Sequence, residues 1–120
     1  GGLGTIFVKS AGNGRSEGEN TNFDATNAMP SAIVVAAVDR DGFVSEYSTE
    51  GASILVSAFG TPGEVVTTDL TGAAGTDPGN TTDSFNGTSA AAPMVTGIVA
   101  LMLQANPELG WRDVSAILAM

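Results

Sequence analysis

A serine stands at the start of the longest apolar stretch of this sequence, among small neighbours. Residues 86–93 read NGTSAAAP and include Ser89, and good helix formers continue from there to Ala105. The free N–H groups and the dipole at a helix N-terminus stabilise developing negative charge, which favours a hydroxyl nucleophile at this position. Thr88 or Ser89 would equally serve as an ordinary N-cap of a buried helix. The residues alone leave both interpretations open.

Asn13 follows the first strand-like run, in a turn that reads SAGNG from residue 10 to residue 14. An Asn in a Gly-rich turn is ordinarily a turn residue, and the turn by itself predicts no more than that. The chain contains no histidine and no cysteine. A Ser-His or Cys-His pair therefore cannot form within these 120 residues, and a general base for Ser89 must come from outside them.

The composition argues against several classes of function. With 13 acidic and 4 basic residues the formal net charge is -9, which argues against nucleic-acid binding, because Lys and Arg must replace the phosphate counterions. The acidity fits a solvated surface, and it also fits calcium sites and basic substrates. There is no dinucleotide fingerprint and no P-loop, so we expect no organic cofactor. The apolar run 90–103 is short and is interrupted by Pro93 and Gly97, so we expect no membrane span.

The elements that must position Ser89 and Asn13 are short strands and long loops, followed by one long helix. The patterns predict strands at 5–10, 32–38, 53–58 and 64–68, loops at 14–30 and 71–84, and helices at 89–105 and 111–120. The run 32–38 reads AIVVAAV, which is typical of a strand covered on both faces. The long helix is apolar on nearly every side, which predicts that it is buried. This order indicates one α/β layered unit over residues 1–120.

Three segments resemble the subtilisin-like serine proteases, the subtilases of peptidase family S8. Residues 87–93, GTSAAAP, resemble the nucleophile segment at the head of the family's central helix, and SAGNG resembles the turn that supplies the oxyanion-hole Asn. Residues 106–114, NPELGWRDV, resemble the corresponding segment of the kexin and proprotein-convertase branch. That branch usually has Thr at the position that Gly110 occupies here. The resemblance covers residues 4–120. It implies a three-layer α/β domain with a mostly parallel sheet and a buried central helix, of which this chain is the C-terminal part.

The resemblance also implies a serine endopeptidase, which hydrolyses a peptide or protein substrate through an acyl-enzyme. Ser89 would be the nucleophile, and Asn13 together with the Ser89 N–H would bind the oxyanion. Gly12 and Thr88 would contact the substrate. The family's catalytic Asp and His lie upstream, in the N-terminal half of the domain, which would be the partner of this chain. We therefore expect residues 1–120 to be inactive and to fold poorly on their own.

Three acidic residues match the kexin-like branch in particular. Asp24 falls where that branch places an S1-pocket aspartate, which holds an Arg or Lys at P1, the residue before the scissile bond. Glu19 and Glu50 fall where it has carboxylates of a calcium site, and carboxylate oxygens suit calcium. Thr21 and Phe23 replace the convertases' paired cysteines, and one residue is inserted near Glu50. The resemblance implies a basic P1 preference and bound calcium, whereas a loop carboxylate by itself is ordinarily just solvated.

Other classes of function stay open at this point. The protein could be a pseudoprotease that serves as a non-catalytic peptide-binding scaffold, although an intact GTS motif together with Asn13 favours an enzyme. A hydrolase of another fold is not favoured, since the chain has no GxSxG elbow. The family implies a secreted or extracytoplasmic location, for which the chain itself contains no signal.

Overall fold

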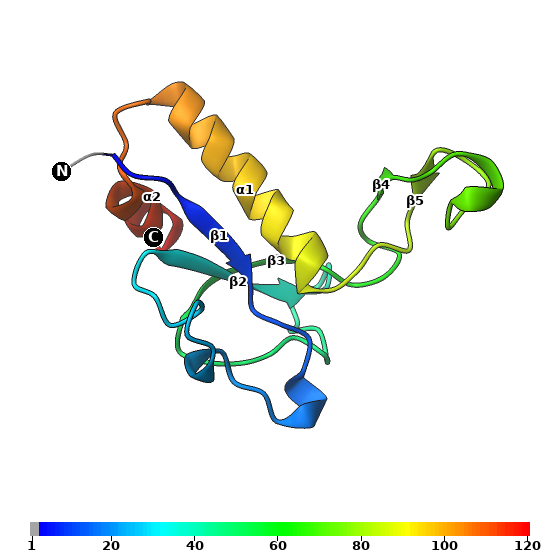
Figure 1. The fold of residues 1–120 in the computed structure, drawn as a ribbon, viewed down its shortest axis with the longest axis horizontal. Helices are drawn as coiled ribbons and strands as arrows, with labels where there is room; N and C mark the ends of the chain where they lie inside the picture. The colour runs from blue at the N-terminus through cyan, green and yellow to red at the C-terminus, as the bar shows by residue number, and fades with distance from the viewer. Residues whose placement is uncertain (1–2) are drawn as a thin grey trace.

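The computed structural model describes residues 3–120 and has a parallel sheet at its centre (Figure 1). Strands β1 (Phe7–Ser10), β2 (Ala32–Val38) and β3 (Ile54–Phe59) lie in the order β1-β2-β3, and both neighbouring pairs are parallel. Residues 33–37 of the central strand are buried on both faces of the sheet. The predicted strand at 32–38 is therefore confirmed, and so is its burial.

Helix α1 (Thr88–Ala105) covers one face of this sheet and contacts all three strands (Figure 1). Helix α2 (Trp111–Leu118) packs at the edge of the same layer. The main hydrophobic core combines alternate residues of β2 with one stripe of α1: Ile33, Val35, Ala37, Ala91, Val95, Val99 and, from α2, Val114. The intervening residues of β2, Val34 and Ala36, point to the other face and pack against Ala11.

The outer side of α1 is not covered by residues 3–120. Ile98 and Leu101 are 50% and 65% exposed, and 33% of the helix is buried. By length and composition alone α1 could cross a membrane, a test that the core helix of a soluble protein also meets. Its packing on the three strands identifies it as a core helix. The predicted burial of this helix holds for the side that faces the sheet.

Residues 65–84 form an arm that extends away from the sheet (Figure 1). Within it, β4 (Thr67–Thr68) pairs antiparallel with β5 (Thr81–Thr82), and the 3₁₀ turn η3 (Gly72–Ala74) lies in the loop between them. The strand predicted at 64–68 is therefore shorter than expected, and the loop predicted at 71–84 contains an unpredicted strand. Strands of two residues are too short to show an alternating pattern, which explains both differences.

The other predicted elements are present with shifted ends. β1 begins at Phe7 and not at residue 5, β3 lies one residue later than predicted, and α2 ends at Leu118. The loop predicted at 14–30 contains two 3₁₀ turns, η1 (Arg15–Glu17) and η2 (Thr21–Phe23). Backbone hydrogen bonds hold both turns: the N–H of Arg15 donates to the carbonyl of Tyr47 (3.2 Å), and the N–H of Thr21 donates to the carbonyl of Glu50 (2.8 Å).

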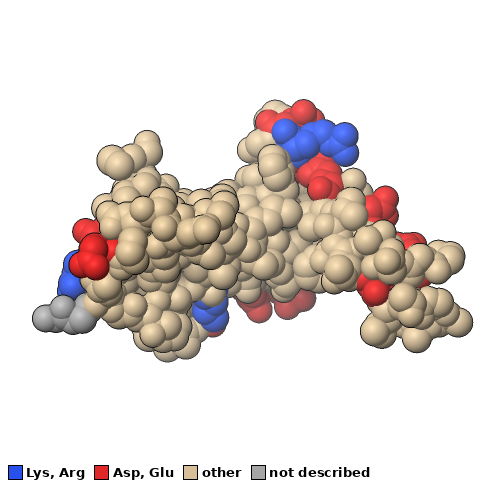
Figure 2. Space-filling view, turned by 90° about the horizontal axis from the view of Figure 1, so that it is seen from above, with Lys and Arg blue, Asp and Glu red and all other residues tan. Residues whose placement is uncertain are grey.

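Basic side chains lie beside acidic ones at the surface (Figure 2). All four basic residues of the chain have a partner: Lys9 pairs with Asp24, Arg15 with Glu50 and Arg40 with Glu64, and Arg112 stacks over the ring of Trp111. Three of the four cations therefore lie next to a carboxylate.

Candidate active site

Ser89 lies in the first turn of α1 and is exposed to solvent. The helix begins directly after Gly87, whose φ of 90° lies in the left-handed region that other residues rarely adopt. A Cβ at Gly87 would also lie 3.2 Å from Nδ2 of Asn13. The glycine of the GTS motif is thus required by the backbone and by the close approach of Asn13, and it places Ser89 at the helix N-terminus.

Thr88 fixes the orientation of the Asn13 side chain. The amide oxygen of Asn13 accepts hydrogen bonds from the backbone N–H of Thr88 (3.0 Å) and from its hydroxyl (2.9 Å). The same hydroxyl accepts a hydrogen bond from the backbone N–H of Gly12 (3.2 Å). The side-chain NH₂ of Asn13 is left without a partner among residues 3–120 and is available as a donor next to Gly87 and Thr88, the two residues that precede Ser89. Thr88 itself is 1% exposed, so its side chain supports Asn13 from within and does not line the neighbouring cavity.

Tyr47 and Gly60 support the segment that precedes Ser89, and neither was predicted as a site residue from the sequence. The backbone N–H of Gly87 donates to the carbonyl of Gly60 (2.9 Å), and the Tyr47 hydroxyl donates to the same carbonyl. A Cβ at Gly60 would lie 2.7 Å from Cβ of Ala37, so a larger residue would push this contact apart. The one signal in the sequence is a glycine directly after a strand, which often marks a close backbone approach.

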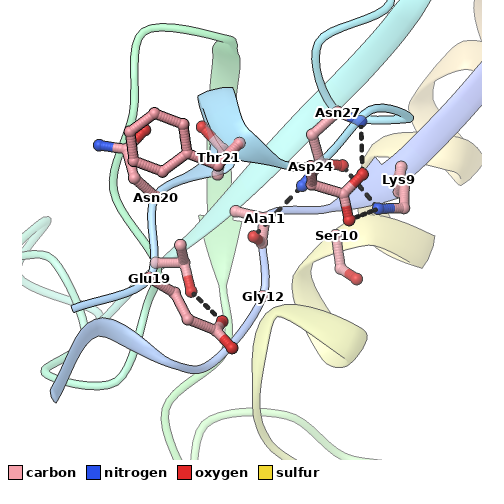
Figure 3. A pocket seen from close by; sticks show the side chains of 11 residues that line it. Lys9, Ser10, Ala11, Gly12, Glu19, Asn20, Thr21, Asp24 and Asn27 are labelled. Atoms are coloured by element: carbon pink, nitrogen blue, oxygen red, sulfur yellow. Dashed lines mark hydrogen bonds and ion pairs between the residues drawn. The ribbon is translucent and has the colours of Figure 1, made fainter. Parts of the chain in front are cut away.

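A cavity of about 410 Å³ lies at the end of β1 and is lined by Gly12, the residue before Asn13 (Figure 3). Its lining consists of Lys9, Ser10, Ala11, Gly12, Glu19, Asn20, Thr21, Phe23, Asp24, Asn27 and Thr49. The structure therefore brings together three of the residues predicted for the site: Gly12, Glu19 and Asp24. Ser89, Thr88 and Glu50 do not line this cavity, and Asn13 adjoins it through Gly12.

Asp24 is the most heavily hydrogen-bonded carboxylate in this cavity. Its Oδ1 accepts hydrogen bonds from the hydroxyl and the N–H of Thr26 and from the N–H of Asn27. The Thr26 hydroxyl, then the Asn27 N–H and then the ammonium of Lys9 hold the pKa of Asp24 well below its usual range. Asp24 is therefore a stable anion at neutral pH, and its Oδ1 is fully occupied.

Lys9 occupies the other oxygen of this carboxylate. Its Nζ lies 3.1 Å from Oδ2 of Asp24 and 2.8 Å from Oδ1 of Asn27, as Figure 3 shows. Lys9 lies on β1, and Asp24 follows η2. Lys9 was not predicted from the sequence, and no local pattern indicates it, because the two partners are 15 residues apart and meet only when the loop folds back.

Comparison with known proteins assigns a family to this arrangement. The sequence model of the subtilase family, peptidase S8, matches residues 1–120. The chain belongs to the subtilase family. It is 40% identical over 121 residues to proprotein convertase subtilisin/kexin type 7 of Homo sapiens and 39% identical over 121 residues to type 6 of the same species. Both alignments cover 98% of this chain, so the predicted resemblance to the convertase branch is confirmed.

The solved structure of the serine protease of Aeromonas sobria matches this subtilase chain with a TM-score of 0.84 and 31% identity, over 95% of the chain. The predicted fold class, an α/β subtilisin-like fold with a parallel sheet, is confirmed. The chain spans 26% of that structure and 15% and 12% of the two convertases.

The two carboxylates expected at a calcium site in this subtilase lie on adjacent segments. Asn20 and Glu50 form a parallel bridge, and Glu19 precedes Asn20. Glu50 is already paired with a cation, since its Oε2 lies 3.3 Å from Nη2 of Arg15. Within residues 3–120 no three acidic, His or Cys side chains are grouped closely enough to hold a metal ion. A third acidic, His or Cys ligand for a calcium ion at Glu19 and Glu50 is therefore not present among residues 3–120.

Proposed function

We propose that this chain supplies the nucleophile and one oxyanion donor of a serine endopeptidase. Ser89 attacks the scissile carbonyl, and a general base from outside residues 1–120 takes its proton, because the chain has no histidine. The same base then protonates the leaving amine, and water hydrolyses the resulting acyl-enzyme. The observation that carries this proposal is the pair of hydrogen bonds from Thr88 to the amide oxygen of Asn13, which leaves the amide NH₂ to the oxyanion.

The rigidity of this donor supports a catalytic role. Donors that are already oriented need no reorganisation when the negative charge develops, and this preorganisation is often the largest single contribution to catalysis. Asn13 is oriented by Thr88, a buried residue, and Thr88 in turn is held by the backbone of Gly12. A peptide-binding scaffold has no need of an amide held in this way beside an exposed serine.

The test is covalent labelling of the natural protein that carries this chain with a fluorophosphonate, followed by peptide mapping. We expect the label on Ser89 and its loss in Ser89→Ala. Ser57→Ala provides the control, because Ser57 is an exposed serine of β3 that no part of the proposed site uses. Isolated residues 1–120 should not be labelled. A folded natural protein that takes no label at Ser89 would leave the pseudoprotease scaffold as the better account.

For the substrate, we propose a peptide or protein with a basic P1 residue, bound with its side chain toward Asp24. The support is the cavity beside the Asn13 turn, in which Asp24 is held as an anion. The test compares kcat/KM for two peptides that differ only in Arg or Leu at P1. Equal values would remove Asp24 from the P1 pocket while leaving the peptidase proposal untouched.

The proposal also includes a calcium ion bound at Glu19 and Glu50 and a secreted or extracytoplasmic location. A calcium ion at Glu19 and Glu50 would need further oxygen ligands, such as carbonyl, amide, hydroxyl or water oxygens, and at Glu50 it would compete with Arg15. Its contribution would be structural, as a clamp between the loops that carry the two carboxylates, and no catalytic step depends on it. The convertase relatives support a secreted or extracytoplasmic location.

A further inference from the structure

We propose that Lys9 is a specificity-determining residue of the cavity, because its ammonium occupies the carboxylate oxygen that a basic P1 side chain would need. The inference rests on the proposed function, in which Asp24 faces the P1 residue. It concerns a residue that the family resemblance does not mark, and it changes the expected substrate preference. The cavity should select basic P1 residues less strongly than a free aspartate would.

Both carboxylate oxygens of Asp24 already accept hydrogen bonds. Three donors from Thr26 and Asn27 occupy Oδ1, so only Oδ2 can meet a substrate cation. Lys9 lies 3.1 Å from that oxygen (Figure 3). A guanidinium binds a carboxylate best through two parallel hydrogen bonds, and this contact requires both oxygens. An incoming Arg must therefore displace Lys9 or share one oxygen with it.

The charges in the cavity lead to the same expectation. Among its lining residues Lys9 carries +1, and Glu19 and Asp24 carry −1 each, so the sum is −1. Without Lys9 the sum would be −2, and the attraction for a cation would rise. The side chains of Lys9 and Asp24 are 38% and 47% exposed, so solvent screens the pair and the effect should be modest.

Lys9 could instead have a purely structural role, holding the loop that contains Asn27 against β1. Both roles predict that loss of Lys9 changes stability, so stability cannot distinguish them. A structural role lowers cleavage of all substrates together. A specificity role changes the ratio of kcat/KM between a substrate with Arg at P1 and one with Leu. This ratio comes from one preparation, so any loss of folded enzyme cancels.

The experiment is a double-mutant cycle in the natural protein: wild type, Lys9→Met, Asp24→Asn and the double variant, each with the Arg and Leu peptides. Met keeps most of the aliphatic length of Lys and removes the charge. We expect Lys9→Met to raise the Arg/Leu ratio about two- to fivefold, the size typical of an exposed ion pair. The same substitution should leave the ratio unchanged when Asp24 is already Asn. Lys9→Arg, which keeps the charge, should retain the wild-type ratio within about twofold.

Arg40→Met is the matched control, because it removes a cation from another ion pair, with Glu64, outside the cavity. It should leave the Arg/Leu ratio unchanged. If Asp24→Asn lowers the ratio while Lys9→Met leaves it unchanged or lowers it, the Lys9 inference is wrong and the Asp24 proposal stands. If Asp24→Asn has no effect on the ratio, both assignments fall. A wild-type protein that cleaves neither peptide overturns the proposed function and this inference together.

Discussion

Two neighbouring regions of the site are stabilised by different interactions. The first is the junction between the turn after β1 and the start of α1, which consists of Asn13, Gly87 and Thr88. The second is the cavity beside it. At the junction, hydrogen bonds from the backbone and the buried hydroxyl of Thr88 hold Asn13, and the backbone N–H of Gly87 donates to the carbonyl of Gly60. In the cavity, Lys9 and Asp24 are connected by an ion pair whose partners are each more than a third exposed. The two regions therefore differ in how strongly a single substitution should affect them.

This difference separates the parts of the site that perform chemistry from the parts that select a substrate. A buried network loses its geometry when one member is removed, because an unsatisfied group remains behind. An exposed pair is replaced by water at little cost. Substitutions at the junction should therefore change turnover by orders of magnitude, and substitutions in the cavity should change preference by small factors.

The largest effect is expected at Asn13. Asn13→Ala removes the proposed oxyanion donor, and kcat should fall by about 10² to 10³ with little change in KM, which is the size known for the corresponding donor of the related enzyme subtilisin. Steady-state kinetics of the natural protein measure both constants. Asn80→Ala, at an exposed position of the arm, is the control and should leave both unchanged. A fall in kcat of less than about tenfold would show that the junction does not serve catalysis in the proposed way.

Gly87 comes next, as a test of whether backbone geometry holds the junction. Gly87→Ala forces a Cβ onto a residue with φ of 90°, and it brings that Cβ to 3.2 Å from Asn13. We expect a loss of about 1–2 kcal/mol in the free energy of unfolding, measured with urea, and a lower kcat. Gly79→Ala is the matched control, since the φ of Gly79 lies outside the left-handed region and a Cβ there would come no closer than 3.9 Å to Thr81, and it should be neutral or slightly stabilising. Equal effects of the two substitutions would contradict this account.

The fold could be predicted from the sequence where a local pattern is strong. β2 is predicted over its full length because AIVVAAV is apolar at every position, and α1 is predicted to within one residue. β4 and β5 have two residues each and no periodicity, so only their surroundings define them. The exposed side of α1 is not predicted either, since an apolar sequence does not indicate which of its sides the chain itself covers.

The candidate site also contains residues that the sequence predicts and contacts that it does not. Asn13 and Ser89 belong to short contiguous motifs, so their resemblance to the subtilases is visible in the sequence. The contacts of Lys9 with Asp24 and of Tyr47 with Gly60 join residues from separate elements, and each depends on how a loop folds back. Whether Glu50 is free or paired also depends on such a contact, because Arg15 meets it only in the folded loop.

A smaller effect is expected at Arg15, the cation that now pairs with Glu50. Arg15→Met should strengthen calcium binding about two- to fivefold, because calcium no longer competes with a guanidinium for this exposed carboxylate. The measurement is the shift of the melting temperature with calcium concentration in the natural protein, compared between wild type and variant. Arg40→Met, at the other arginine ion pair, is the control. If calcium shifts neither melting temperature, the proposed calcium site is wrong.

The smallest effect on activity is expected in the arm. There the carboxylate of Asp69 holds the loop between β4 and β5 by hydrogen bonds to the backbone. This carboxylate accepts the N–H groups of Leu70 (2.8 Å), Thr76 (2.7 Å) and Asp77 (2.9 Å). The N–H of Asp77 above all, and then those of Leu70 and Thr76, lower the pKa of Asp69 below its ordinary value of 3.8. The folded arm therefore binds this proton less readily than the unfolded chain does.

The sign of the pH dependence follows from that lowered pKa. The stabilisation by Asp69 is fully present above 3.8 and is lost as the pH falls through the lower folded value. In hydrogen exchange with mass spectrometry, Asp69→Asn should lower the protection of residues 70–77 at neutral pH, and the difference from wild type should shrink in acid. Asp41→Asn, at an exposed turn, is the control. A difference that persists unchanged below the folded pKa would mean that the charge of Asp69 does not hold the arm, and that the arm depends, like the β1–α1 junction, on neutral hydrogen bonds.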